Sequence, residues 1–330
     1  MTARTITVVG AGILGLWQAL VLAQHGHKVT LVEASPEPFA DAASRWAGAM
    51  LAPYCEEEGA EPRVRDLGLE GMALWREAFP GIVSNGTLVV AAARDRSELN
   101  RFARATRGHV LIDAEQVAAL EPDLGQRFQS GLYYQDEAHM APREAMAFLL
   151  AAVRHAGVDV RLGTTASLSG DGPVIDCRGL AARAELPTLR GVRGERLLIK
   201  TNEIKLTRPV RLLHPRYPLY VVPWADGVFM VGATVIESED PSPVTVRSAL
   251  ELLGLAYALH PAFGEAEIIE LGAGLRPSFP DNVPKVVVRG ERLFVNGAYR
   301  HGFLLAPVLA KAAADYLDRG ARLEGIVVDG

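Results

Sequence analysis

The stretch Thr5-Ile6-Thr7-Val8-Val9-Gly10-Ala11-Gly12-Ile13-Leu14-Gly15 decides the fold of the amino-terminal part of the chain. Its first five residues are all β-branched, which is typical of a strand buried on both faces. Apolar residues then recur at three- and four-residue spacing from Leu16 to Ala23 and predict a helix that stops near Gly26. Lys28 to Glu33 predicts a second strand, and this strand ends in a carboxylate.

The glycines and the acidic residue each have a mechanical reason in a site for a dinucleotide. Gly10 permits a tight turn, Gly12 lets the backbone approach a pyrophosphate, and Gly15 lets helix and strand pack closely. The helix start offers free N–H groups and a partial positive charge to phosphates. Glu33, about 20 residues downstream, is placed to bind a ribose diol. A chance glycine turn is the alternative for the glycines alone, but the ordered units together predict dinucleotide binding, without separating FAD from NAD.

Two further segments favour FAD. The small residues of Ala42 to Pro53 predict a second helix start, capped by Ser44, that wraps more of a long dinucleotide; a helix used only for close packing is the alternative. Arg292 to Val295 predicts a strand that runs into a glycine loop at Asn296 to Gly302, followed by an alanine- and leucine-rich helix to about Leu317. Helix-terminal N–H groups near a flavin would stabilise the negative charge that its carbonyl edge gains on reduction.

Sequence blocks along the chain resemble the glycine oxidases, members of the D-amino acid oxidase family that are often linked to thiamine biosynthesis. Besides the amino-terminal motif, the blocks are Ser44 to Pro53, His214 to Thr234, Gly274 to Pro284 and Gly297 to Pro307. They follow the expected order over nearly the whole chain, which makes the resemblance more specific than any one motif. It implies an α/β fold, α+β overall, with a Rossmann-like FAD-binding domain and a β-sheet-rich substrate-binding domain.

Carried over residue by residue, the resemblance implies a non-covalent FAD site. Sarcosine oxidase relatives attach FAD through a carboxy-terminal cysteine, whereas no cysteine follows Cys177 here. The residues expected at the cofactor are Gly10, Gly12, Ile13, Leu14, Gly15, Glu33, Ala34, Ala43, Ser44, Gly48, Ala49, Met50, Gly297, Arg300, His301, Gly302, Phe303 and Leu304. We expect a discontinuous FAD-binding domain over 1–85, 141–200 and 265–330, and a substrate domain over 86–140 and 201–264.

The resemblance also implies that Tyr220, Arg276 and Arg300 serve the substrate. In glycine oxidases, residues that match Tyr220 and Arg276 bind the substrate carboxylate, for which a phenol and a guanidinium are suitable donors. Arg300 lies in the loop expected beside the flavin. An ordinary strand aromatic and structural or solvated arginines are the alternatives. Val235 stands where glycine oxidases often have methionine, so the resemblance leaves the shape of the pocket open.

We expect hydride transfer from the α-carbon of glycine or a small amino acid to FAD, followed by reoxidation by dioxygen. The products would be an imine or oxo acid, ammonia and hydrogen peroxide, and transfer of the imine to thiazole synthesis is left open. Neither His214 nor His301 is required as a base, and no metal-ligand or nucleophile-elbow motif is apparent. The alternatives are an oxidase or dehydrogenase of the same family for sarcosine, other N-methyl amino acids or D-amino acids, a flavin- or nicotinamide-dependent hydroxylase or dehydrogenase, and a non-catalytic dinucleotide-binding redox sensor.

Composition narrows the classes of partner and location. The 330 residues are 49% hydrophobic and 22% charged, with a formal net charge of −5, so we expect a large core and no attraction to nucleic acid or anionic membranes. Two cysteines are too few for a disulfide framework and favour a reducing, cytoplasmic setting. No apolar run reaches the roughly 18 residues that a membrane span needs. A homo-oligomer remains open.

Overall fold

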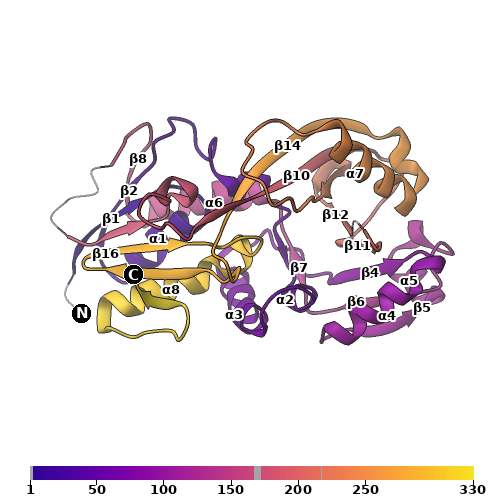
Figure 1. The fold of residues 1–330 in the computed structure, drawn as a ribbon, viewed down its shortest axis with the longest axis horizontal. Helices are drawn as coiled ribbons and strands as arrows, with labels where there is room; N and C mark the ends of the chain where they lie inside the picture. Colours follow the sequence, from indigo (N-terminus) through magenta and orange to yellow (C-terminus); the bar gives the residue numbers. More distant parts are fainter. Residues whose placement is uncertain (1–2, 167–171, 217) are drawn as a thin grey trace.

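A seven-stranded sheet surrounds the amino-terminal strand and forms one of two lobes (Figure 1). The structure is a computed structural model that describes residues 3–166, 172–216 and 218–330. In sheet order the strands are β17 (Val327–Asp329), β15 (Lys285–Arg289), β16 (Arg292–Asn296), β9 (Val174–Asp176), β1 (Thr5–Val9), β2 (Lys28–Val32) and β8 (Asp159–Arg161). Neighbouring strands are parallel, except for the antiparallel pair of β15 and β16.

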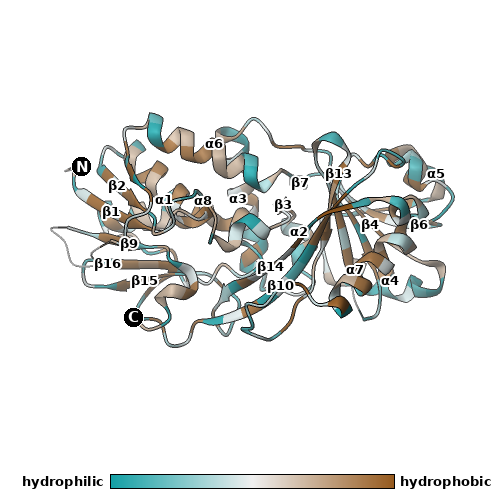
Figure 2. Ribbon diagram, turned by 90° about the horizontal axis from the view of Figure 1, so that it is seen from above, coloured by the Kyte–Doolittle hydropathy of each residue, from teal (hydrophilic) through white to brown (hydrophobic). Residues whose placement is uncertain are grey.

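Long helices pack around this sheet because each buries an apolar stripe. They are α1 (Ile13–Gln24), α3 (Pro62–Ala78), α6 (Pro142–His155) and α8 (Gly302–Arg319). The α1 helix packs against both α6 and α8, and α8 also packs against α3. Ile6 and Val8 of β1 are fully buried, as expected for a strand covered on both faces. Apolar residues line the central strands of this lobe in Figure 2.

An eight-stranded sheet forms the second lobe. In sheet order its strands are β14 (Glu267–Ser278), β10 (Arg190–Lys200), β13 (Val228–Gly232), β12 (Leu219–Pro223), β11 (Val210–Leu213), β4 (Thr87–Ala91), β6 (Ser130–Tyr134) and β5 (Val110–Asp113). The long strands β10 and β14 reach back toward the first lobe (Figure 1). This sheet therefore extends from the outer end of the molecule to the junction between the lobes.

The two faces of the eight-stranded sheet have different partners. Leu219 and Val221 belong to a core cluster with α7 (Val246–Leu259), whereas Tyr220 and Val222 pack with Met230 on the opposite face. This alternation is the period-two geometry of a strand whose two faces meet different surroundings. The shorter elements are α2 (Pro53–Glu56), α4 (Arg96–Ala105), α5 (Ala114–Leu120), the strand pair β3 (Met50–Leu51) and β7 (Ala138–His139), and short 3-10 turns, of which η1 (Ala43–Trp46) bears on the site.

Most predicted elements are confirmed, with one difference near residue 44. The predicted strands and helices within 5–33 and 292–317 form. The strands β12 and β13 pair as a hairpin, whose turn holds Asp226 and Gly227 at positive φ. The small-residue segment, however, does not start a helix capped by Ser44. It forms the short η1 turn, whose N-cap is Ala42, and then enters β3. Ser44 instead uses its hydroxyl oxygen to accept a hydrogen bond from the backbone N–H of Ile13, 3.2 Å away.

The membership of strands in the two sheets suggests a different division into domains from the one expected. The strands β10 and β14 both belong to the eight-stranded sheet, although the ranges 141–200 and 265–330 were assigned to the FAD-binding domain on sequence grounds. A division that follows the sheets places 190–200 and 267–278 with the substrate lobe. The domain limits therefore stay a proposal, and we prefer the division by sheets because a strand shares its hydrogen bonds with its own sheet.

Candidate active site

The three glycines of the turn after β1 differ in how closely other atoms approach them. Gly10 has a φ of +97°, and a Cβ atom there would lie 2.8 Å from the backbone oxygen of Cys177. A Cβ at Gly15 would lie 1.7 Å from the oxygen of Gly10, so α1 packs directly on the turn. At Gly12 the nearest heavy atom would be Ser44 Oγ at 3.6 Å. Gly12 is thus the least crowded of the three glycines, and it is the one at which the motif brings a pyrophosphate close to the backbone.

Two helix starts meet at this place. The α1 helix begins after Gly12 and α8 begins at Gly302, and neither helix has a side-chain cap from its own N-cap residue. A Cβ at Gly302 would lie 3.6 Å from Cγ2 of Ile13, which places the two first turns side by side. Free N–H groups of both helices thus present partial positive charge to the same region. This arrangement suits an extended anionic coenzyme.

Glu33 is held at the end of β2, next to the glycine turn. Its carboxylate accepts hydrogen bonds from the backbone N–H of Ala11 at 2.7 Å and of Ser35 at 3.1 Å. The neighbouring Ala34 is exposed. A half-buried carboxylate in this position can accept hydrogen bonds from a ribose diol.

The other residues expected at the cofactor fall into two sets. Ala43, Ser44, Gly48, Ala49 and Met50 follow one another through η1 into β3, between the glycine turn and the eight-stranded sheet. In the second set, Gly297 has a φ of +75°, and Gly302 to Leu304 form the first turn of α8. The rings of Phe303 and Trp75 stack at 6.0 Å, and Leu304 packs against Gly68 of α3. Phe303 and Leu304 therefore offer a cofactor their backbone rather than their side chains.

FAD fits these residues. The low crowding at Gly12, the two adjacent helix starts and the fixed Glu33 carboxylate match the pyrophosphate and ribose of a dinucleotide. Leu14, Gly15 and Ile13 would contact it through the backbone of the α1 start. The loop of Arg300 and His301 then lies where the coenzyme would extend toward the second lobe.

Tyr220 lies on the sheet face that looks toward this loop. Its ring is confined by glycines, because a Cβ at Gly232 or at Gly48 would lie 3.1 Å or 3.3 Å from Cε2 of Tyr220. Met230 packs against the same glycine, since its Cε would lie 2.3 Å from a Cβ at Gly48. The small residues of the 48–50 segment thus permit close approach of the two lobes at Tyr220.

Arg276 lies near Tyr220 and has no carboxylate partner within ion-pair distance among the described residues. Its Nη1 donates hydrogen bonds to the backbone oxygens of Thr234 at 3.1 Å and Arg193 at 3.3 Å. Burial lowers the pKa of Arg276, and the charge of Arg300 lowers it further, while Tyr220 acts in the opposite direction. The guanidinium is therefore a half-buried cation, with donors left for an anion.

Arg300 faces a carboxylate that sequence reasoning missed. Glu56 of α2 accepts a 2.8 Å hydrogen bond from Arg211, lies 3.7 Å from Nη2 of Arg300, and lies 3.5 Å from Nδ1 of His301. Burial would raise the pKa of Glu56, but Arg300 and Arg211 outweigh it and hold that pKa well below its usual value. Glu56 stands in the run Glu56-Glu57-Glu58, which has the composition of a solvated surface, so no sequence signal marked it.

The two histidines considered as bases have other surroundings. Burial lowers the pKa of His301 to about 4, so its ring is neutral near pH 7. His214 Nδ1 accepts a hydrogen bond from the N–H of Arg216 at 3.2 Å. Neither arrangement supplies a strong base to the space beside Arg276.

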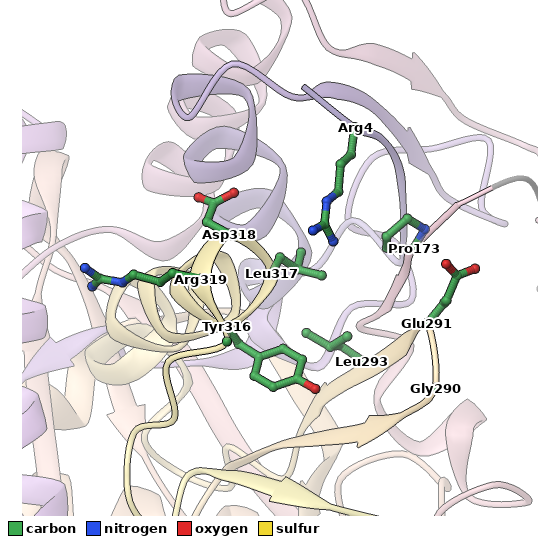
Figure 3. Close-up of a pocket in the computed structure, with 10 residues that line it drawn as sticks. Arg4, Pro173, Gly290, Glu291, Leu293, Tyr316, Leu317, Asp318 and Arg319 are labelled. Carbon is green, nitrogen blue, oxygen red and sulfur yellow. The ribbon is translucent and has the colours of Figure 1, made fainter. Parts of the chain in front are cut away.

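A cavity of about 440 Å³ opens near the amino-terminal ends of β1, β9 and β16 (Figure 3). Arg4, Pro173, Glu291 and Tyr316 help to line it, and none of the residues expected at cofactor or substrate does. It therefore lies apart from the candidate site. Within the described ranges, no helix is long and apolar enough to cross a membrane, and no cluster of His, Cys, Asp or Glu could hold a metal ion.

Comparison with known proteins agrees with this geometry. The chain is 52% identical to a Rhizobium etli protein named as a thiamine biosynthesis oxidoreductase, ThiO, over 94% of this chain and 95% of that protein. It is 26% identical to the glycine oxidase of Pseudomonas aeruginosa, over 94% of both chains. The crystal structure of glycine oxidase from Bacillus cereus has the same fold, with a TM-score of 0.83, 21% identity, and coverage of 97% of this chain and 99% of that one.

The sequence profile of one family spans both lobes. The family described as FAD dependent oxidoreductase matches residues 5–316, from β1 into the last turn of α8. The match includes the glycine turn, Glu33, the 43–50 segment and the α8 start, which together form the cradle that fits FAD. Cofactor and fold class are thus as the sequence predicted. The chain belongs to the family of FAD-dependent oxidoreductases.

Proposed function

We propose that this enzyme oxidises glycine or another small amino acid at its α-carbon, to an imine that hydrolyses to an oxo acid and ammonia. The observation that carries the proposal is Arg276, a half-buried cation beside Tyr220 without a carboxylate partner among the described residues. The names of the relatives, a thiamine biosynthesis oxidoreductase and a glycine oxidase, support it. FAD, when bound, supplies the hydride acceptor.

Arg276 and Tyr220 would bind the substrate carboxylate. A guanidinium can offer two parallel N–H groups to a carboxylate, and a phenol adds one more donor. Because Nη1 of Arg276 is already held by two backbone oxygens, the guanidinium cannot rotate freely. Fixing the carboxylate fixes the α-carbon relative to the residues at the α8 start, and such orientation is a main source of rate enhancement.

The charges of the site favour the neutral amine that hydride loss requires. Arg276 and Arg300 are both cations, and cations close to an ammonium group lower its pKa. Glu56 is the nearby carboxylate, but Arg211 already binds it. We therefore assign binding and orientation to Arg276, Tyr220 and Arg300, and no side chain is needed as a base.

Three finer points belong to the same proposal. Dioxygen would be the electron acceptor, with hydrogen peroxide as product, and the imine would serve thiamine thiazole synthesis. The relatives named for this pathway and for glycine oxidase activity motivate both points. Cys55 and Cys177 are buried and unpaired, which fits a cytoplasmic protein.

An anaerobic absorbance titration of the purified, FAD-loaded protein tests the proposal. Glycine, sarcosine and D-alanine are added separately, and bleaching of the flavin band reports reduction by each. We expect glycine to bleach the band at the lowest concentration and peroxide to form when air is admitted. Faster reduction by sarcosine or D-alanine would favour the alternative substrates, and reduction by NAD(P)H alone would refute the proposal.

A further inference from the structure

Glycines on the site face of the eight-stranded sheet make room for large side chains. A Cβ at Gly272 or Gly274 would lie 2.3 Å or 2.8 Å from the ring of Trp46. A Cβ at Gly232 would meet Tyr220 at 3.1 Å. Gly194 of β10 belongs to this set, and the side chain that covers it is Arg276.

The contact between Gly194 and Arg276 is the tightest of these that involves a charged group. A Cβ at Gly194 would lie 2.1 Å from both Cζ and Nη2 of Arg276. In the pairing of β10 with β14, Arg276 stands opposite Val192 and Gly194 stands opposite Gly274. The guanidinium therefore extends along the neighbouring strand and lies flat over the bare backbone of Gly194.

Two backbone carbonyls near Gly194 also hold the guanidinium, and we call Gly194 and these two oxygens the seat of Arg276. Nη1 of Arg276 donates to the oxygen of Arg193, directly before Gly194, and to the oxygen of Thr234. These two bonds hold one edge of the guanidinium while Gly194 lets its plane approach the strand. The remaining N–H groups have no carboxylate partner among the described residues and are available to the substrate carboxylate.

Folding does not by itself require glycine at this position. The φ angle of Gly194 is not positive, so an L-residue can adopt its backbone conformation. The atoms that a Cβ would meet are the far end of a flexible side chain. Glycine also weakens the interior of a strand, so its presence there calls for a reason other than strand stability.

We propose that Gly194 is a positioning residue that seats Arg276 for recognition of the substrate carboxylate. This inference rests on the proposed function, because it assumes that Arg276 binds the carboxylate. Any side chain at position 194 would occupy the space that the guanidinium of Arg276 now takes, and would push the guanidinium away from the sheet. The enzyme would then fold and bind FAD but would hold its substrate in the wrong place.

A double-mutant cycle tests this inference. Gly194→Ala, Arg276→Ala and the combined variant are prepared as FAD-loaded enzymes and compared by KM and kcat with glycine. Gly254→Ala is the matched control, because nothing lies within 4 Å of a Cβ at this exposed glycine of α7. FAD content and thermal unfolding report whether each variant folds. Gly194→Ser, measured in the same way, provides a second substitution with a different side chain.

Gly194→Ala should raise KM at least about tenfold with FAD content and unfolding temperature retained, because a shift of about 1 Å in a binding group has effects of this size. In the Arg276→Ala background, Gly194→Ala should have no further effect on KM, because no guanidinium is left to be displaced. Unchanged KM in both Gly194 variants, or additive effects in the combined variant, would overturn the inference. Unchanged kinetics in Arg276→Ala alone would instead overturn the role of Arg276 in the proposed function.

Discussion

Arg211 of β11 donates a hydrogen bond of 2.8 Å to Oε1 of Glu56, although 155 positions separate them in the chain. Arg211 is the cross-strand neighbour of Tyr220, and Glu56 also faces Arg300 and His301 at the start of α8. This pair joins the sheet that carries Tyr220 to the loop that carries Arg300. It therefore connects the substrate side of the site with the cofactor side.

Replacing Glu56 should destabilise the protein. Glu56→Ala leaves the guanidinium of Arg211, whose side chain is 8% exposed, without its counter-charge, and we expect a loss of about 3 kcal/mol in the free energy of unfolding. Denaturant unfolding measures it. Glu70→Ala is the control, since Glu70 forms an exposed pair with Lys311 and should cost less than about 1 kcal/mol. Equal losses in the two variants would contradict the importance of the buried pair.

Removing the phenolic hydroxyl of Tyr220 should weaken substrate binding and leave folding intact. Tyr220→Phe keeps the ring between Gly48 and Gly232 but loses one donor to a charged carboxylate. We expect a loss of about 1.5 kcal/mol, or roughly a tenfold rise in KM for glycine. Tyr257→Phe on the exposed side of α7 is the control and should leave KM unchanged. If KM stays constant in Tyr220→Phe as well, the hydroxyl does not bind the carboxylate.

Two neighbouring glycines should respond differently to alanine. Gly12→Ala places a methyl group in uncrowded space, so the chain should fold, but FAD affinity should fall at least about tenfold because the pyrophosphate can no longer approach. Gly15→Ala would place its Cβ 1.7 Å from the oxygen of Gly10, and the chain should lose several kcal/mol of stability. Flavin titration and thermal unfolding separate these effects. Loss of folding in Gly12→Ala would show that this glycine serves packing rather than the cofactor.

Asp318 at the end of α8 should make the free energy of unfolding depend on pH in the acid range. Burial would raise its pKa, but hydrogen bonds from His25 at 2.8 Å and His27 at 2.9 Å outweigh burial and keep the pKa of Asp318 below its usual value. Ionised Asp318 thus contributes stability above the unfolded-state pKa of about 3.9, and this contribution disappears as the pH falls through the lower folded-state pKa.

The variant Asp318→Asn isolates this contribution. It should lose about 1–3 kcal/mol of unfolding free energy at pH 6, and the difference from the unaltered protein should shrink as the pH falls below 4. Urea unfolding at several pH values gives the comparison. Asp315→Asn, which alters a pair with the exposed Arg319, should show little difference at any pH. A difference for Asp318→Asn that is independent of pH would exclude the ionised pair as its source.

The amino-acid sequence by itself determined the local elements of the cofactor lobe. The β-branched run of Thr5 to Val9, the glycine turn and the helix after it form as expected, because their periodicity and φ requirements are fixed within a few residues. The hairpin around Asp226 and the shared face of Tyr220 and Val222 have the same local origin, because a turn and a period of two are also fixed within a few residues.

Only the tertiary structure decided which distant residues meet. The capping of α1 by Ser44, the counter-charge of Glu56 and the seat of Arg276 over Gly194 each join segments that no local pattern relates. A carboxylate in an acidic run and a glycine in a strand look alike in sequence whether they are exposed or buried. Their roles arise from packing of the two sheets, because burial and proximity, rather than residue type alone, set charge partners and free space.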